Sequence, residues 1–304
     1  MEKGHAMRWQ ILKPELISLN VSPSITLNTR IWGTDSHLPT IIMVHGFPDN
    51  SLIWQKIAER LSPMFRVIAY DVRGAGGSSI PTRTHDYKLN YLIDDLEAVI
   101  NHVSPQQKVH LVGHDWGSIQ CWEAATSPHL QTKIASFTSI SGPSLDHAAY
   151  WVLESLSKGS ITSKTKVLKQ LAHSWYIAAF HLPLASKVTW RVAFNKWPTR
   201  LAKFKALQGE DFASQASDGA HGVKLYRANF LDKLFKHQER KTDIPIQLII
   251  PTKDKFVTAG LFDDLGRWAS HIWRHEIDAE HWVQRTHPDE ISAYIREFVD
   301  FIEG

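Results

Sequence analysis

The stretch KVHLVGHDWGSIQCWEAA, at positions 108–125, decides the fold. Its apolar start, Lys108–Val112, predicts a short buried strand, and Ser118–Thr126 predicts a helix. Between them the pentapeptide GHDWG at 113–117 fits the G-x-Nu-x-G pattern of a nucleophile elbow in its required strand–turn–helix context. Small residues are needed there because the turn is sharp and the central backbone is strained. We therefore predict that Asp115 is a nucleophile, in preference to a helix N-cap in an ordinary loop.

Strand and helix patterns alternate on both sides of this elbow. Strands are expected at Ile17–Leu19, Ile25–Ile31, Pro39–His45, Arg66–Tyr70, Ile134–Ser139, Ile244–Ile250 and His271–Ile277, and helices at Leu52–Leu61, Leu89–Val103 and Asp289–Ile302. The first two strands read as an antiparallel hairpin. The alternation predicts an α/β protein with a mostly parallel sheet flanked by helices on both faces.

The pattern changes between residues 142 and 240. This segment has helical composition and many large aromatic residues, Trp190, Phe194 and Trp197 among them. Because the strand pattern resumes afterwards, we expect one α/β core (1–141 and 241–304) interrupted by a helical cap (142–240), and not two independent domains. Insertions over an open sheet lie at the carboxyl ends of its strands, where active sites form.

Composition limits the classes of partner. The 304 residues carry a formal net charge of +3, and the densest basic stretch, Lys233–Lys241, is interrupted by Glu239, so we interpret it as a solvated loop or helix face and expect no nucleic-acid partner. We see no signal peptide and no apolar run of membrane-spanning length. The single cysteine, Cys121, excludes a disulfide within the chain and is expected to be a buried core residue. We expect a cytoplasmic protein.

An aspartate at the elbow indicates a particular reaction. A carboxylate can attack a saturated carbon and form an ester, which water then hydrolyses at the ester carbonyl. A serine in the same attack would form an ether that water does not cleave. Asp115 therefore favours an epoxide or alkyl halide substrate over an acyl ester.

The second step needs a base, which we expect to be His281, just after the last predicted strand. Its imidazole needs an orienting carboxylate. We prefer Asp254 because it directly follows a buried strand, and the chain order Asp115, Asp254, His281 matches the order of this class of fold. The rivals for this acid are Asp263, Asp264 and Asp278.

The tetrahedral intermediate of ester hydrolysis needs an oxyanion hole. The tetrapeptide HGFP at 45–48 follows a predicted strand, so its loop can face the elbow. We expect the backbone N–H groups of Phe47 and Trp116 to be the donors. We interpret His45 and His114 as supporting groups outside the reaction itself.

Together, HGFP at 45–48, GHDWGS at 113–118, Asp254 and His281 resemble the epoxide hydrolase branch of the α/β-hydrolase superfamily over essentially the whole chain. The loop Asp71–Ser79 is similar to the family's D-x-R-G-x-G-x-S loop, which we treat as structural. Members that open epoxides carry two cap tyrosines that hydrogen-bond to the epoxide oxygen. The resemblance assigns these roles to Tyr176, in a Y-x-x-x-F pattern, and to Tyr226, which precedes Arg227.

Two alternatives stay open. A haloalkane dehalogenase of this fold would use the same aspartate, but Phe47 stands where such enzymes often place a halide-binding Asn. A second alternative is a non-catalytic protein of the same fold that binds a small ligand. The resemblance otherwise implies a small apolar epoxide and water as reactants. No cofactor is implied, no metal-ligand spacing is found, and a homodimer is one option for assembly.

Overall fold

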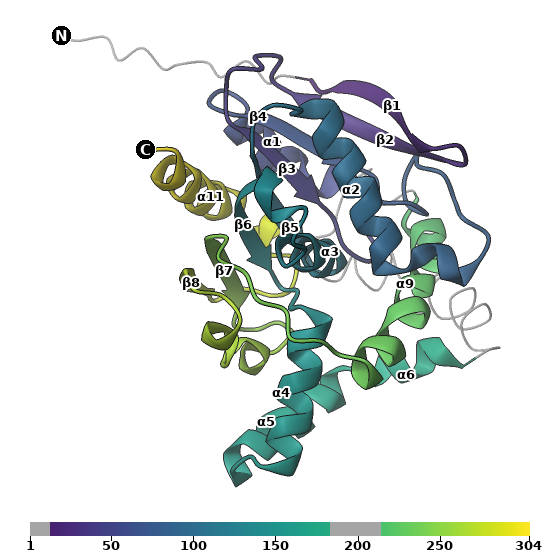
Figure 1. The fold of residues 1–304 in the computed structure, drawn as a ribbon, viewed down its shortest axis with the longest axis vertical. Helices are drawn as coiled ribbons and strands as arrows, with labels where there is room; N and C mark the ends of the chain where they lie inside the picture. Colours follow the sequence, from purple (N-terminus) through teal and green to yellow (C-terminus); the bar gives the residue numbers. More distant parts are fainter. Residues whose placement is uncertain (1–12, 183–213) are drawn as a thin grey trace.

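The computed structural model describes residues 13–182 and 214–304, which contain one eight-stranded sheet in the order β1-β2-β4-β3-β5-β6-β7-β8 (Figure 1). The strands are β1 (Glu15–Ser22), β2 (Ile25–Trp32), β3 (Thr40–Val44), β4 (Arg66–Tyr70), β5 (Val109–His114), β6 (Ile134–Ile140), β7 (Ile246–Pro251) and β8 (Ile272–Ile277). The pairs β1–β2 and β2–β4 are antiparallel, and the other five pairs are parallel. The predicted mostly parallel sheet and its opening hairpin are confirmed.

Helices cover both faces of the sheet because the central strands are apolar on both sides. In β3, Ile42 and Val44 belong to one buried apolar cluster, and Ile41 and Met43 belong to the other. The helices of the core are α1 (Gln55–Leu61), α2 (Leu89–Val103), α3 (Trp116–Ala125), α10 (Val283–Thr286) and α11 (Pro288–Glu303). Residues of α2 and α3 pack in the first cluster and residues of α1 and α11 in the second. Short 3-10 turns lie at Ser51–Trp54, Thr84–Tyr87, Gln131–Lys133, Ala259–Phe262 and Leu265–Arg267.

Between β6 and β7 the described chain is helical. The helices there are α4 (Leu145–Ser157), α5 (Ile161–His173), α6 (Trp175–His181) and α9 (Gln215–Phe235). Figure 1 shows α4 and α5 projecting from the end of the molecule opposite β1 and β2. The aromatic residues Trp190, Phe194 and Trp197 lie outside the described residues, as does the start of the chain through residue 12.

The basic stretch at 233–241 differs from its interpretation as a solvated face. Lys233 Nζ lies 2.6 Å from a carboxylate oxygen of Glu123 and 2.6 Å from one of Asp146. Arg240 pairs with the same two acids at 3.0 and 2.9 Å. We call Glu123, Asp146, Lys233 and Arg240 the clamp cluster. It fastens α4, α9 and the segment before β7 to the core helix α3.

Within residues 13–182 and 214–304, no helix is both long enough and apolar enough to cross a bilayer. Cys121 is fully buried in α3, as expected.

Candidate active site

Asp115 forms the turn between β5 and α3, with φ of 52° and ψ of −120°. A positive φ is costly for a residue with a side chain, so the turn persists only because its surroundings hold it. Those surroundings leave no space beside it. A Cβ on Gly117 would lie 2.0 Å from the carbonyl oxygen of Val44, and one on Gly46 would lie 2.5 Å from the side chain of Asp115. The glycines therefore let the HGFP loop and the elbow approach each other.

Two backbone N–H groups meet at the Asp115 carboxylate. Phe47 N–H donates to Oδ1 at 2.7 Å, and the N–H of Trp116 also hydrogen-bonds to this carboxylate. Asp115 is only 8% exposed. Burial raises its pKa to about 6, although the charge of His281 and these two N–H groups oppose the rise. The two expected oxyanion donors thus converge on the expected nucleophile.

His281 lies between the carboxylates of Asp254 and Asp115. Its Nδ1 is 2.8 Å from Asp254 Oδ2, and its Nε2 is 3.8 Å from Asp115 Oδ2. Asp254 follows β7, and its Oδ1 accepts N–H groups of Phe256 and Val257 at 2.7 and 3.1 Å. Burial lowers the pKa of His281, but the charge and hydrogen bond of Asp254, and then the charge of Asp115, outweigh it and raise the value to about 8.

The rival acids lie elsewhere. Asp263 pairs with Lys166, and Asp278, which is 75% exposed, pairs with Lys253. Asp264 is also exposed. Asp254 alone of these four carries a carboxylate within hydrogen-bonding distance of His281 in the described chain.

Tyr176 of α6 and Tyr226 of α9 lie next to each other above the elbow. Their ring centroids are 5.9 Å apart, and Tyr226 also contacts the rings of Trp116 and Phe47 at 4.9 and 5.2 Å. Burial raises the pKa of both hydroxyls well above the usual value, and the negative charge of Asp115 raises it further. Both hydroxyls are therefore neutral donors near Asp115 at physiological pH.

Asp49 is a buried acid that the sequence did not single out. Its Oδ2 accepts the indole N–H of Trp282 at 2.9 Å, while no hydrogen bond to Oδ1 is found among the described residues. Burial raises the pKa of Asp49 to about 7, and the charge of Asp115 adds to the rise. The signal that was available is its position: it directly follows the HGFP motif.

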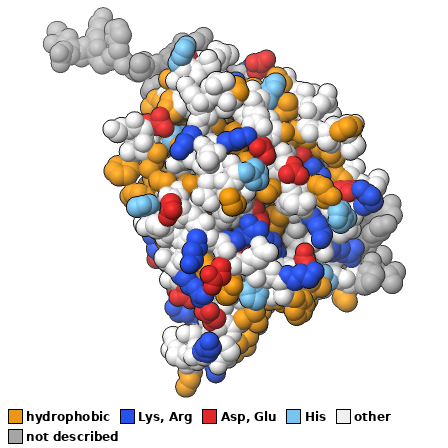
Figure 2. All heavy atoms as spheres, in the orientation of Figure 1, with side chains coloured by type: hydrophobic (Ala, Val, Ile, Leu, Met, Phe, Trp, Pro, Cys, Tyr) orange, Lys and Arg blue, Asp and Glu red, His pale blue; other side chains and the backbone are white. Residues whose placement is uncertain are grey.

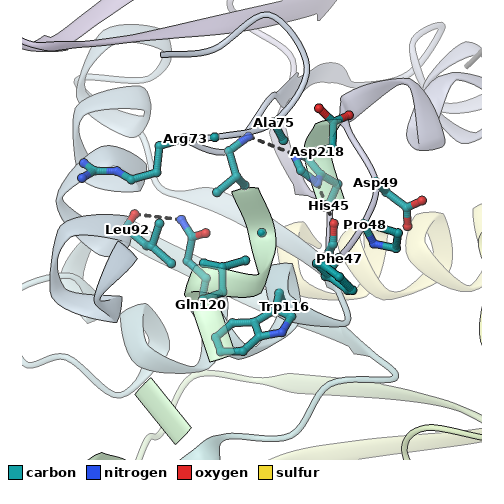
Figure 3. A pocket seen from close by; sticks show the side chains of 15 residues that line it. His45, Phe47, Pro48, Asp49, Arg73, Ala75, Leu92, Trp116, Gln120 and Asp218 are labelled. Atoms are coloured by element: carbon teal, nitrogen blue, oxygen red, sulfur yellow. Dashed lines mark hydrogen bonds between the residues drawn. The ribbon is translucent and has the colours of Figure 1, made fainter. Parts of the chain in front are cut away.

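A small pocket of about 20 Å³ lies between the HGFP loop and the start of α3 (Figure 3). Phe47 and Trp116 line it, together with Asp49, Gln120 and Asp218. Asp115, His281 and Tyr176 do not line it. The pocket therefore borders the reaction site without being the space in which a substrate would meet Asp115.

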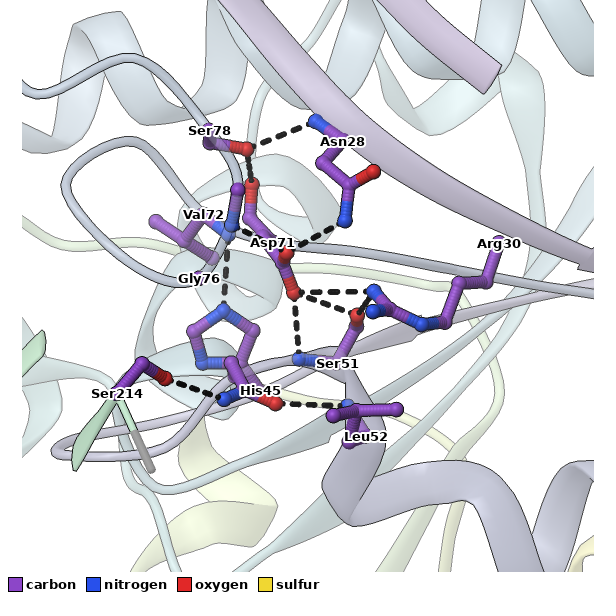
Figure 4. Close-up of polar contacts among 12 residues, drawn as sticks. Asn28, Arg30, His45, Ser51, Leu52, Asp71, Val72, Gly76, Ser78 and Ser214 are labelled. Carbon is purple, nitrogen blue, oxygen red and sulfur yellow. Dashed lines mark hydrogen bonds and ion pairs between the residues drawn. The ribbon is translucent and has the colours of Figure 1, made fainter. Parts of the chain in front are cut away.

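The loop at 71–79 is held by a buried polar network (Figure 4). Asp71 accepts the N–H groups of Ser51 and Gly77 at 2.8 and 2.9 Å and the side chain of Asn28 at 2.8 Å. His45 Nε2 accepts the N–H of Val72 at 2.8 Å. These contacts position the HGFP loop from behind, which agrees with the structural interpretation of the 71–79 loop.

Residues 39–288 match the α/β hydrolase fold family. The "probable oxidoreductase EphD" of Mycobacterium tuberculosis is 33% identical over 274 residues, which are 88% of this chain and 46% of that protein. The chain thus spans about half the length of this curated relative. Epoxide hydrolase 3 of Xenopus tropicalis is 27% identical over 287 residues, with 88% of this chain and 74% of that protein covered.

The solved structure of the Bacillus megaterium epoxide hydrolase has a TM-score of 0.77 and 21% identity, and covers 94% of this chain and 100% of that chain. At this identity the likeness shows the fold. The resemblance to the epoxide hydrolase branch, drawn from the motifs, is confirmed by relatives that bear this name. The family match extends over most of the chain, and this chain belongs to the α/β hydrolase fold family.

Proposed function

We propose that this chain is an epoxide hydrolase that opens an apolar epoxide to a vicinal diol through an ester on Asp115. The observation that carries the proposal is that Tyr176 and Tyr226 lie side by side, with ring centroids 5.9 Å apart, and that the ring of Tyr226 lies 4.9 Å from that of Trp116, the residue after Asp115. An elbow carboxylate attacks carbon, and two hydroxyl donors suit a leaving group that stays attached as an alkoxide. The relatives named epoxide hydrolase support this choice.

In the first half-reaction, the Asp115 carboxylate attacks one epoxide carbon, and the bond from that carbon to the epoxide oxygen breaks. The electron pair moves to this oxygen, which takes the proton of one tyrosine hydroxyl, that of Tyr176 or Tyr226, and leaves a tyrosinate that the other hydroxyl stabilises by hydrogen bonding. The product is a neutral hydroxyalkyl ester of Asp115. Phe47 N–H, at 2.7 Å, aligns the carboxylate for this attack.

In the second half-reaction, His281 takes a proton from water, and the hydroxide attacks the ester carbonyl. The N–H groups of Phe47 and Trp116 hold the oxyanion, and the ester C–O bond then breaks. The departing alkoxide takes the proton held by His281 and leaves as the diol, and the carboxylic acid of Asp115 returns its proton to the tyrosinate. Formation of the ester on Asp115 also makes His281 ready to act as the base. The charge of Asp115 helps to raise the pKa of His281 to about 8, so its loss in the ester lowers that pKa and favours the neutral imidazole. Asp254 keeps the ring oriented.

We assign residues 142–240 to a cap over this site and residues 1–141 and 241–304 to the core.

The aromatic rings around the tyrosines suggest the substrate class. Phe180 contacts both Tyr176 and Tyr226, Phe230 stacks on Tyr226, and Phe256 contacts Tyr176. Such a wall favours an aryl or alkyl epoxide.

A haloalkane dehalogenase remains the second candidate because it would need the same Asp115, His281 and Asp254. One feature favours the epoxide. A halide leaves without a proton and needs only hydrogen-bond donors, whereas an alkoxide needs an acid, which a tyrosine hydroxyl can be. Phe47 also offers no side-chain N–H to a halide.

The ester intermediate can be tested by isotope transfer. A single turnover in ¹⁸O-labelled water, with enzyme in excess, should place the label in Asp115, because water attacks the Asp115 ester carbonyl. Peptide mass spectrometry of the 109–125 region would detect it. Label in the diol after this single turnover, with none in the peptide, would mean direct hydration of the epoxide and would reject the ester.

The leaving group can be tested by trapping. His281→Ala should stall the ester, and its intact mass should rise by the whole mass of a small aryl epoxide. With a haloalkane we expect no adduct, whereas a gain of the alkyl part alone would favour the dehalogenase. Ligand binding with no adduct from either compound would favour a non-catalytic binder. The matched control is His287→Ala, which changes a residue distant from Asp115 and should leave turnover intact.

A further inference from the structure

The helices α5 and α6 expose large apolar side chains at one end of the molecule. Ile161 is 86% exposed, Leu168 is 61% exposed and Trp175 is 69% exposed. In α5 the buried side chains are Val167 and Gln170, and at 100° per residue Ile161 and Leu168 fall on the opposite face. Figure 2 shows apolar and basic side chains together at this end of the molecule. Exposed apolar groups gathered in this way mark an interaction surface.

The charge of the same segment has one sign. Residues 155–182 contain four lysines and no Asp or Glu. Lys166 pairs with Asp263 of the core. Across the described parts of the chain, Lys158, Lys164 and Lys169 have no carboxylate within salt-bridge distance, and the acid just before them, Glu154, is paired with Arg267. The charge of Lys158 still acts on Glu154, so the surface combines apolar side chains with an excess of cations over acids.

We propose that this surface, formed by Ile161, Leu168, Trp175, Lys158, Lys164 and Lys169, docks on an anionic lipid bilayer. Ile161 and Leu168 of α5 and the indole of Trp175, at the start of α6, insert at the acyl boundary, and the lysines contact the anionic headgroups. A bilayer fits better than a second copy of the chain, because a two-fold contact through this face would bring the same unpaired lysines against each other. Docking is peripheral and does not depend on the proposed epoxide chemistry.

Flotation with vesicles tests the docking without any substrate. The protein should float with equimolar phosphatidylcholine and phosphatidylglycerol and stay unbound with phosphatidylcholine alone. Binding should weaken as salt is raised, because salt screens the lysine–headgroup attraction. Equal binding to both vesicle types, or to neither, would overturn the proposal.

Surface variants locate the contact. Changing Lys158, Lys164 and Lys169 together to Gln should weaken vesicle binding about a hundredfold, at about fivefold per lysine. Ile161→Ser with Leu168→Ser should weaken it at least about tenfold. The matched control is Leu16→Ser with Lys56→Gln, which alters an exposed leucine of β1 and an exposed lysine of α1 and should bind vesicles normally. Losses of equal size in the control would overturn the assignment to α5.

A label reports insertion directly. Because Cys121 is fully buried, Leu168→Cys can be labelled selectively with an environment-sensitive dye, with Lys56→Cys as the control position. Anionic vesicles should shift the emission of the dye at position 168 to the blue and leave that at position 56 unchanged. If vesicles cause no shift at 168, while sedimentation shows a dimer that Ile161→Ser with Leu168→Ser dissolves, the surface is a self-interface and the proposal fails.

Discussion

Two clusters of charged side chains among the described residues are balanced differently. The first is the clamp cluster, in which two acids face two cations and each acid lies within 3.0 Å of both. The second, which we call the catalytic cluster, consists of Asp49, Asp115, Asp254 and His281. There, three acids face the imidazole of His281, with Asp115 and Asp254 3.8 and 2.8 Å from it, and the charge of Arg285 also acts on Asp49.

The difference teaches what charge balance does inside a protein. With a cation for every acid, the ions of the clamp cluster attract one another and fix the geometry between α3, α4 and α9. With too few cations, burial leaves the pKa values of Asp115, Asp49 and His281 at about 6, 7 and 8. Groups with such values exchange protons near neutral pH, which suits acid–base work. We therefore expect changes in the clamp cluster to lower stability at any pH. Changes in the catalytic cluster should alter turnover at Asp115, Asp254 and His281, and the pH dependence of stability at Asp49.

The largest effect should come from Asp254→Asn. The amide cannot stabilise the imidazolium, so turnover should fall about a thousandfold or more while the fold persists. The control is Asp278→Asn, an exposed acid that pairs with Lys253, which should keep nearly full activity. Measured kcat for both variants decides it: equal losses would mean that Asp254 has no special part in the site.

Breaking the clamp cluster should cost stability. Lys233→Ala leaves Asp146, which is fully buried, with one cation fewer and should lower the free energy of unfolding by about 3 kcal/mol. The exposed pair of Lys236 with Asp232 provides the comparison, because Lys236→Ala should cost less than about 0.5 kcal/mol. Denaturant unfolding measures both. A Lys233→Ala variant as stable as Lys236→Ala would show that the clamp contributes nothing.

The pH dependence should report the catalytic cluster. Asp115 must be a carboxylate to attack, and its pKa is about 6, so kcat/KM should fall about tenfold per pH unit below that value. The clamp variant Lys233→Ala should show the same decrease of kcat/KM below about pH 6. If kcat/KM fell only below about pH 4, the ordinary range of an aspartate, the excess of acidic residues would not raise the pKa of Asp115.

The smallest effect should come from Asp49→Asn. Because the folded pKa of about 7 exceeds the reference value of 3.8, the unfolded chain loses this proton first, and stability is lost as pH rises between these values. Asparagine removes that loss while its amide oxygen still accepts the Trp282 N–H. We expect a gain of about 1 kcal/mol at pH 8 and none at pH 4. Unfolding at the two pH values measures it, and an equal change at both would contradict the raised pKa.

Most of the fold could be predicted because its signals are local. The apolar runs of β3 and β5 end in glycine loops, and the elbow sequence itself requires a strand before it and a helix after it. The preference for Asp254 over Asp278 used the same kind of signal, because Asp254 lies in the loop after a fully buried strand and well before His281. The structure brings Asp254 to His281. The triad roles themselves remain predictions.

The clamp cluster and Asp49 could not be predicted, because their signals are not local. Lys233 and Arg240 look like a solvated basic run until folding brings Glu123 of α3 beside them. No periodicity in the sequence links these positions. Asp49 likewise reads as one more polar loop residue until Trp282, from the far end of the chain, covers it.

The crowding around the elbow has a consequence for laboratory evolution. At Gly46 and Gly117 even a methyl group would collide with neighbouring atoms, at 2.5 and 2.0 Å. We therefore expect glycine to be the one residue tolerated at either position in a saturation library. Substitutions are better tolerated in the aromatic wall, where the rings of Phe180 and Phe230 pack against that of Tyr226. The turn around Asp115 thus tolerates little change, whereas the aromatic wall can vary. A search for altered enantioselectivity should therefore substitute residues of the aromatic wall.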